Sequence, residues 1–255
     1  YYARVSGATV DKIQLYGLSV SVSPTVTLSI SGATMAEAGG VATVTATLSA
    51  TWTQAVTVNL DFAGTAAPID DYTASAATII IPVGSTTGSV TLTALQDTLV
   101  EGSQTIVVDI GSITNATESG AQQVTATITD ADTATVGFTL ATSMRGEDAG
   151  ATTLAATLST AAGNTLENGA TFSVGTTLGN AEGADFTANV VSLSFAAGSG
   201  QGASPTTELI VTPTADVLVE GDETPTFTLS VSGGAAGLGS QASHALTITD
   251  ADTAT

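Results

Sequence analysis

Along most of the chain, hydrophobic and polar residues alternate one by one, which is the pattern of half-buried β-strands. The alternating segments are short, and clusters of Gly, Asp, Ser and Pro separate them. No segment keeps the helical period of about 3.6 residues over three turns. The pattern predicts two successive sets of seven strands, at 26–31, 41–49, 55–62, 77–81, 87–95, 104–110 and 122–129, and at 136–142, 151–159, 169–176, 189–195, 206–212, 225–231 and 243–249.

The two sets of strands belong to an internal repeat. The nine residues 127–135 return unchanged as 247–255. Three further blocks recur in the same order: Glu-Ala-Gly at 37–39 with Glu-Asp-Ala-Gly at 147–150, Asp-Asp-Tyr-Thr at 70–73 with Asp-Phe-Thr at 185–187, and Asp-Thr-Leu-Val-Glu-Gly at 97–102 with Asp-Val-Leu-Val-Glu-Gly at 216–221. The repeat predicts an all-β protein of two tandem seven-stranded Greek-key, immunoglobulin-like β-sandwiches. We expect the domains to be 25–134 and 135–255.

Residues 1–24 have no counterpart later in the chain. The segment from Val10 to Val22 alternates polar and apolar residues, which predicts one or two strands, and Pro24 marks a boundary after them. Two interpretations stay open. The segment is the last strand of a preceding module, or it is a donor strand that completes the sheet edge of a neighbouring subunit.

Composition narrows the classes of partner. Hydrophobic residues make up 43% of the chain and charged residues 10%, which indicates a folded protein. The 23 acidic residues outnumber the three basic ones, so a nucleic-acid or anionic-membrane partner is excluded.

No apolar segment reaches the length of a membrane span, and without Cys there is no disulfide. Because the sequence starts at Tyr1 without Met, we expect a processed chain or a segment of a longer one.

Pairs of carboxylates follow the last strand of each repeat. Asp130 and Asp132 form the first pair, and Asp250 and Asp252 form the second. Two side chains at spacing i, i+2 on an extended segment point to the same side. Two such carboxylates repel each other when alone, but they make a good partial ligand set for a hard cation. Since the second set of strands begins directly after Thr135, the first pair should lie near the junction of the two repeats.

Taken together and in this order, the recurring blocks resemble the Calx-beta domain. This seven-stranded Greek-key sandwich is known from the regulatory region of sodium–calcium exchangers, from integrin β4 and from many bacterial surface proteins. In calcium-binding members, carboxylates meet at one end of the sandwich. Carried over to this chain, the resemblance implies calcium (Ca2+) ligands at Glu37, Asp71, Asp97, Asp130 and Asp132 in the first repeat, and at Glu147, Asp185, Asp216, Asp250 and Asp252 in the second.

The match to the family pattern is incomplete. Further candidate ligands are Asp70, Glu101, Asp148 and Glu220. Members that bind several ions carry an Asp where this chain has Gln96 and Ala215. The second Glu of the family's Glu-x-x-Glu is replaced by Gln104 in the first repeat, whereas Glu223 is present in the second. We therefore expect one or two ions per repeat. The alternative is a solvated acidic surface with vacant sites.

The sequence does not favour an enzyme. His244 is the only histidine, and it shares strand parity with Leu246 and Ile248, so we expect it on the inward face of its strand. With one His and no Cys, a zinc site is not expected either. Carboxylates that lie close together can also form a catalytic pair, but here the calcium pattern already accounts for them.

The sequence thus leads to three hypotheses. The first is a non-enzymatic, calcium-binding structural module of a secreted or cell-surface repeat protein, acting in adhesion or a matrix, in which Ca2+ rigidifies the loops and the junction. Its partners would be calcium ions and neighbouring repeats or identical subunits. The second is a homopolymeric extracellular filament or sheath subunit assembled by β-strand addition. The third is an accessory module of a large extracellular hydrolase.

Overall fold

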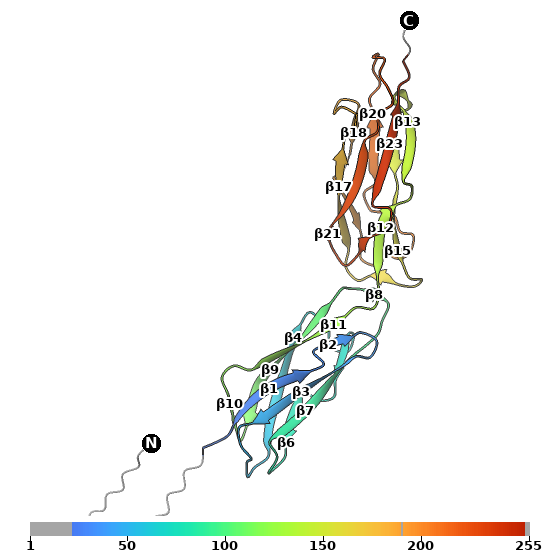
Figure 1. Ribbon diagram of the computed structural model, residues 1–255. Helices are drawn as coiled ribbons and strands as arrows, with labels where there is room; N and C mark the ends of the chain where they lie inside the picture. Colours follow the sequence, from blue (N-terminus) through green and yellow to red (C-terminus); the bar gives the residue numbers. More distant parts are fainter. Residues whose placement is uncertain (1–21, 190, 253–255) are drawn as a thin grey trace, which may run out of the picture.

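The computed structural model describes residues 22–189 and 191–252, which form two elongated β-sandwiches standing end to end with a bend between them (Figure 1). The strands predicted within residues 1–24 lie outside the described part, apart from residues 22–24, which form no strand. One short 3-10 helix, Glu147–Ala149, interrupts the second domain. Within the described residues, no helix is long and apolar enough to cross a membrane.

The first domain consists of two five-stranded sheets. One sheet has the strand order β10 (Thr117–Glu118), β1 (Thr25–Ser31), β3 (Val41–Leu48), β7 (Thr87–Ala94) and β5 (Tyr72–Ala74). The other has the order β2 (Thr34–Ala36), β11 (Gln123–Thr129), β9 (Gln104–Thr114), β4 (Val56–Gly64) and β6 (Thr78–Ile81). Neighbouring strands are antiparallel except for the two edge pairs β1–β10 and β2–β11, which are parallel.

The second domain repeats this arrangement with one sheet in two pieces. Its five-stranded sheet has the order β13 (Thr142–Gly146), β23 (Ser243–Thr249), β21 (Thr226–Gly233), β17 (Ala170–Thr177) and β19 (Ser192–Phe195). The two pieces are β15 (Ala156–Thr160), β12 (Ala134–Phe138) and β22 (Gly237–Leu238), and β14 (Thr152–Leu154), β20 (Leu209–Pro213) and β18 (Phe186–Ala188). The prediction of two tandem immunoglobulin-like β-sandwiches is confirmed.

The first strand of each domain changes sheet part-way along. In the first domain β1 and β2 belong to different sheets, and Gly32 lies between them with a φ of 68°. A Cβ at this position would lie 2.6 Å from the carbonyl oxygen of Val41, so the turn requires glycine. In the second domain the single strand predicted at 136–142 is wrong: β12 ends at Phe138, and the next strand, β13, begins at Thr142 in the other sheet. Alternation did not show this change, because β2 has only three residues and Met144, the large apolar side chain of β13, is exposed.

The core of each domain comes from strand faces that alternate as predicted. In β3, for example, every second residue from Ala42 to Leu48 is buried. The first core consists largely of Val, Ile, Leu and Ala side chains, whereas the second adds several phenylalanines. One residue of the first repeat does not follow this division. Val100, at the tip of a loop of the first domain, is 2% exposed and belongs to the core of the second.

The tip that carries Val100 joins the two domains. It forms the two-residue strand β8 (Leu99–Val100), which pairs in parallel with β16 (Thr165–Leu166) of the second domain. Two further backbone hydrogen bonds, from Thr165 N to Thr98 O at 3.1 Å and from Glu167 N to Val100 O at 3.2 Å, extend this pairing. Strand pairing and a shared apolar core therefore connect the repeats in addition to the chain itself.

Candidate metal centres

The carboxylate of Glu37 holds together three segments that are far apart in the sequence. Glu37 directly follows β2, and its backbone N donates to Thr129 O at 3.1 Å, which continues the pairing of β2 with β11. Its side chain is only 4% exposed. Oε1 accepts a hydrogen bond from Asp97 N and Oε2 accepts one from Ala131 N, both at 2.9 Å. A buried Glu at this position thus fixes the loops that carry the next predicted ligands.

Asp130 fixes the same loops from the other side. Its Oδ2 accepts hydrogen bonds from Glu101 N and Gly102 N, both at 2.8 Å, and its Oδ1 accepts one from Asp132 N at 2.7 Å. Asp97 closes its own turn, because its Oδ1 accepts from Leu99 N at 2.7 Å. These bonds to backbone amides hold the carboxylates in place.

In the first repeat, the carboxylates form two overlapping groups of three. Within each group, one oxygen of every member lies within 4.8 Å of the others. Asp97 belongs to both groups and could bridge two cations. The members are Glu37, Asp97 and Asp132 in one group, and Asp71, Asp97 and Glu101 in the other.

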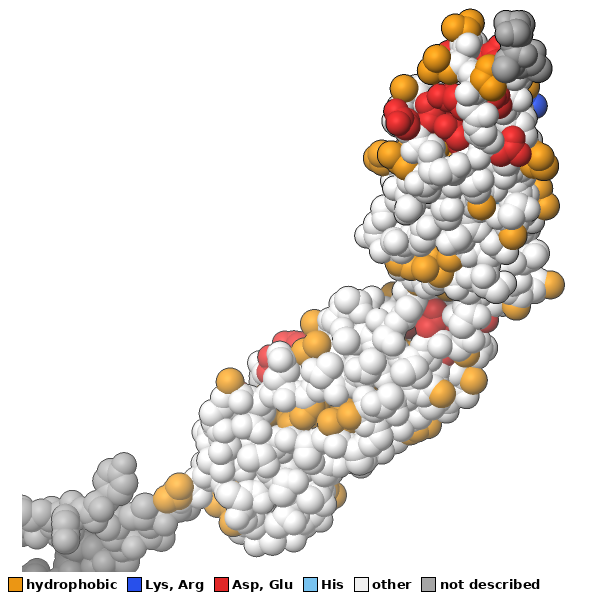
Figure 2. Space-filling model, turned by 45° about the horizontal axis from the view of Figure 1, so that its top comes forward, with side chains coloured by type: hydrophobic (Ala, Val, Ile, Leu, Met, Phe, Trp, Pro, Cys, Tyr) orange, Lys and Arg blue, Asp and Glu red, His pale blue; other side chains and the backbone are white. Residues whose placement is uncertain are grey.

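The second repeat also has two groups, which lie at the far end of the second domain, where Figure 2 shows acidic side chains gathered. Their members are Glu147, Asp250 and Asp252, and Asp185, Glu220 and Glu223. The supporting bonds recur as well. Asp250 accepts from Glu220 N and from Asp252 N, both at 2.7 Å, and Asp216 accepts from Leu218 N at 2.7 Å. The contact of Glu147 with Ala251 N is longer, at 3.5 Å.

Eight of the ten predicted ligands lie in these groups, and Asp130 and Asp216 do not. These two instead accept backbone hydrogen bonds that shape the ligand-bearing loops. Glu101 and Glu220, which were further candidates, do belong to groups, whereas Asp70 and Asp148 do not. Glu223 was not among the predicted ligands. Its position as the second Glu of the Glu-x-x-Glu block could have indicated it. The role of all these residues as metal ligands remains a prediction.

Unpaired buried oxygens indicate that a cation suits these groups. Asp252 Oδ2 is buried without a hydrogen-bond partner among the described residues, and so is Oε1 of Gln104, at the position that Glu223 holds in the second repeat. Buried acceptors normally have a donor, and an isolated one is costly. Calcium binds about six to eight oxygens, drawn from carboxylates, amide and backbone carbonyls and water. The all-oxygen donor set therefore fits calcium better than a metal that prefers nitrogen or sulfur ligands.

Without a cation, crowding shifts the proton affinity of several of these groups. Burial, followed by the charges of Asp71 and Asp97, raises the pKa of Glu101 to about 7. Burial, followed by the neighbouring Asp185, likewise raises the pKa of Glu223 to about 7. Burial and neighbouring carboxylates also raise the pKa of Glu147 and of Glu220. A bound cation would remove this electrostatic cost.

One residue of the second domain reaches the first metal centre. The Asn164 side-chain amide donates to Oδ1 of Asp132, and Gln96 Nε2 donates to Oδ2 of the same carboxylate at 3.3 Å. Asn164 lies directly before β16, the strand that pairs with β8. The sequence did not reveal this contact, because the loop from Ala161 to Gly169 is longer than its counterpart in the first repeat.

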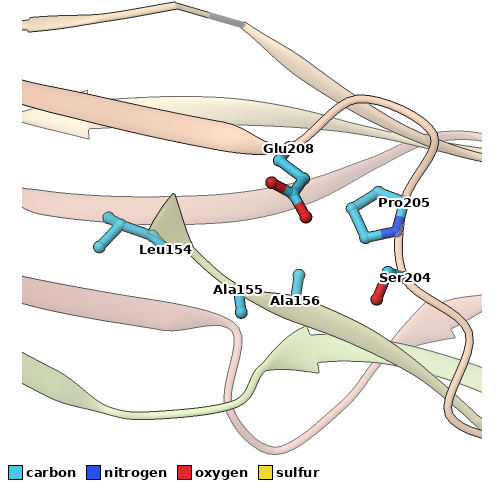
Figure 3. Close-up of a pocket in the computed structure, with 6 residues that line it drawn as sticks. All are labelled: Leu154, Ala155, Ala156, Ser204, Pro205 and Glu208. Atoms are coloured by element: carbon cyan, nitrogen blue, oxygen red, sulfur yellow. The ribbon is translucent and has the colours of Figure 1, made fainter. Parts of the chain in front are cut away.

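Other features of the described structure do not form a comparable site. A cavity of about 20 Å³ between Leu154–Ala156 and Ser204–Pro205, into which the Glu208 carboxylate points, has room for about one water molecule (Figure 3). His244 is buried on the inward side of β23, as its strand parity predicted. Both ring nitrogens lie 2.7 Å from a partner, Nδ1 from Leu140 O and Nε2 from Ser143 Oγ, so the ring is held in place by the core.

Comparisons with known proteins give one family. The model of the Calx-beta domain matches residues 22–134 and again residues 130–252. No curated protein matches the chain. Among solved structures, the chain is similar to the apo form of the Calx CBD1 domain, at 20% identity and a TM-score of 0.40, covering 47% of this chain and 99% of that one. It is also similar to CBD12 from CALX1.2, at 12% identity and a TM-score of 0.38, covering 88% and 99%.

We expect the protein to become more stable at lower pH when calcium is removed. Because the pKa of Glu101 and of Glu223 is about 7 in the folded state and 4.5 in the reference state, folding takes up protons between these values. The free energy of unfolding in a chelator should therefore be larger at about pH 5 than at about pH 8.

Denaturant unfolding across this pH range, in chelator and in excess calcium, measures the effect. Calcium competes with protons for the same carboxylates, so in excess calcium the slope should flatten or reverse. An equal slope in both conditions would contradict the assignment.

Proposed function

Because the chain belongs to the Calx-beta family, whose model matches it from residue 22 to residue 252, we propose that it is a calcium-binding structural module. Each sandwich binds calcium at its carboxylate end, and the ion in the first repeat stabilises the junction with the second. The observation that carries this proposal is the recurrence of two three-carboxylate groups, with matching backbone hydrogen bonds, in both repeats. Scattered surface acids would not recur in this way.

The geometry supports up to two ions per repeat. In the first repeat the two groups share Asp97, which can bridge neighbouring ions. For two ions, the groups of the first repeat offer five different carboxylates and those of the second repeat offer six, because Asp97 is shared and Gln104 stands where the second repeat has Glu223. The buried, unpartnered Oε1 of Gln104 is a candidate neutral ligand. Affinity for calcium depends on the number of charged ligands, so we propose that the second repeat binds its second ion more tightly.

The first centre is placed to act on the junction. Asp130 fixes the backbone of Glu101 and Gly102, which directly follow β8, and Asp132 accepts the amide of Asn164 from the other domain. An ion held by Glu37, Asp97 and Asp132 would therefore tie the base of the β8 loop to the start of the second domain. Removing the ion would leave repelling carboxylates at the junction of the two domains.

Calcium binding at such sites makes a modest but relevant contribution to the free energy of unfolding. Extracellular modules bind calcium with dissociation constants of roughly 10⁻⁴ to 10⁻³ M. At about 1 mM calcium, a site of about 10⁻⁴ M adds about 1.4 kcal/mol to the free energy of unfolding. This contribution matters in domains without disulfides, and it requires the millimolar calcium found outside cells.

We therefore place the module in a secreted or cell-surface repeat protein with a structural, adhesive or matrix role. The filament and hydrolase-module alternatives rest on residues 1–24, which lie largely outside the described residues.

Replacing Asp97 and Asp132 together by Asn should remove the calcium response of the first repeat, because Asp97 belongs to both of its carboxylate groups and Asp132 belongs to one of them. In excess calcium, we expect the melting temperature of this repeat to fall by about 5 °C, equivalent to the loss of about 1.4 kcal/mol. Small-angle scattering should show a more variable angle between the domains. In EDTA the variant and the parent should differ much less.

Asp61→Asn is a matched control, because Asp61 is an exposed carboxylate on β4 that belongs to none of the carboxylate groups. If the double variant kept the full calcium-dependent rise in melting temperature, the proposed ligand set of the first repeat would be wrong.

A reciprocal exchange tests the difference between the repeats. Gln104→Glu adds a carboxylate to the first repeat and should raise its calcium affinity by up to about tenfold. Glu223→Gln should lower the affinity of the second repeat by a similar factor. Isothermal titration calorimetry of both variants measures these changes. Shifts in the same direction, or no shift in either, would count against a role of these positions in binding.

A further inference from the structure

Two loops with nearly the same sequence differ sharply in how their tips are covered. In the loop of residues 97–102, Val100 is 2% exposed, because it lies in the core of the second domain. In the loop of residues 216–221, Val219 occupies the matching place and is 56% exposed. Its neighbours Val217 and Leu218 are 85% and 57% exposed. Figure 2 shows hydrophobic side chains near the acidic ones at this end of the second domain.

The exposed loop makes two of the hydrogen bonds that shape the buried one. In both loops the leading Asp accepts a hydrogen bond from the backbone N two residues later at 2.7 Å. In both, the Asp after the last strand accepts from the backbone N of the loop Glu, at 2.8 Å from Glu101 and 2.7 Å from Glu220. The loops differ at their last residue, because Gly102 has a φ of 81° and Gly221 does not have a positive φ. The shared bonds already order part of the loop, which lowers the conformational entropy lost when a partner binds.

The second domain, which covers the loop of residues 97–102, contributes specific backbone and side-chain groups to this contact. The backbone of Thr165–Leu166 pairs with Leu99–Val100, and the buried Leu166 belongs to the same core cluster as Val100. Asn164 donates to Asp132, which also accepts from Gln96. At the far end, Asp252 corresponds to Asp132. Its Oδ2 is buried without a partner among the described residues, because Ala215 stands in the place of Gln96, which donates to this oxygen of Asp132.

We infer that the loop of residues 216–221 is a docking surface for a further β-sandwich domain of the second-repeat type. That domain receives Val219 in its core as this second domain receives Val100, by parallel pairing with an Asn-Thr-Leu segment whose Asn donates to Asp252. The sequence that follows is compatible, because residues 247–255 are identical to residues 127–135, which lead into the second domain. The inference goes beyond calcium binding and does not depend on it.

A second copy of this chain is a poorer occupant. Its first domain has a short loop, residues 49–55, in the place of the receiving loop, with Trp52 and no Asn-Thr-Leu segment. Its second domain has the receiving segment, but that segment is already paired with the chain's own β8. A domain of the second-repeat type whose receiving segment is free meets both requirements.

A three-domain chain tests the inference. A copy of residues 136–252 is joined directly after Thr255, so that the new junction repeats the sequence of the existing one. The copy is labelled segmentally for NMR, and hydrogen exchange is measured at the amides of its Thr165 and Glu167, which donate across the existing junction. We expect both amides to be protected, and Val219→Ser to increase their exchange rates at least tenfold.

Val217→Ser is the matched control, because the counterpart of Val217 is Thr98, which is exposed beside the existing junction. It should leave the protection unchanged. Both valines are exposed in the parent chain, so neither change threatens folding. Unprotected amides, or protection that Val219→Ser does not alter, would overturn the inference. So would sedimentation showing that the parent chain of residues 1–255 dimerises through Val219, because the occupant would then be a second copy.

Discussion

The structure depends on the balance between two effects of the same carboxylates. Glu37 and Asp130 accept hydrogen bonds from the backbone amides of distant loops and so hold one end of the first sandwich together. The same arrangement brings Asp97, Asp132 and Glu37 within 4.8 Å of one another, where their charges repel. In the neighbouring group, burial and then the charges of Asp71 and Asp97 raise the pKa of Glu101. A bound divalent cation would offset the repulsion without breaking the hydrogen bonds, and this is why we propose a structural role for calcium.

The position of each centre determines what it can influence. The first centre lies at the base of the β8 loop, and its Asp132 contacts Asn164 of the second domain. Ion binding, loop conformation and the pairing of the two domains are therefore parts of one local structure. The second centre has the same construction at the free end of the second domain, beside the exposed Val219.

Much of this could be predicted from the sequence. Alternation predicted the main strands, and the recurrence of acidic blocks indicated residues that the fold brings together, such as Glu37 and Asp97. The change of the first strand between sheets was missed, because β2 is only three residues long and β13 carries no apolar alternation. The roles of Asp130 and Asp216 in shaping loops were missed, because a pattern of acids does not distinguish a ligand from an acceptor of backbone hydrogen bonds. The contact of Asn164 depends on a loop that is longer than its counterpart in the first repeat and differs from it in sequence, so a comparison of the repeats could not reveal it.

The most direct test of calcium as the structural ion is thermal unfolding of the chain in EDTA, followed by a calcium titration to tens of millimolar with magnesium as the control. Calcium accepts the irregular, carboxylate-rich coordination that these groups offer, whereas magnesium requires a tighter octahedral shell. Our account predicts a melting temperature that rises with calcium and responds much less to magnesium. An unchanged melting temperature throughout the calcium titration would contradict it.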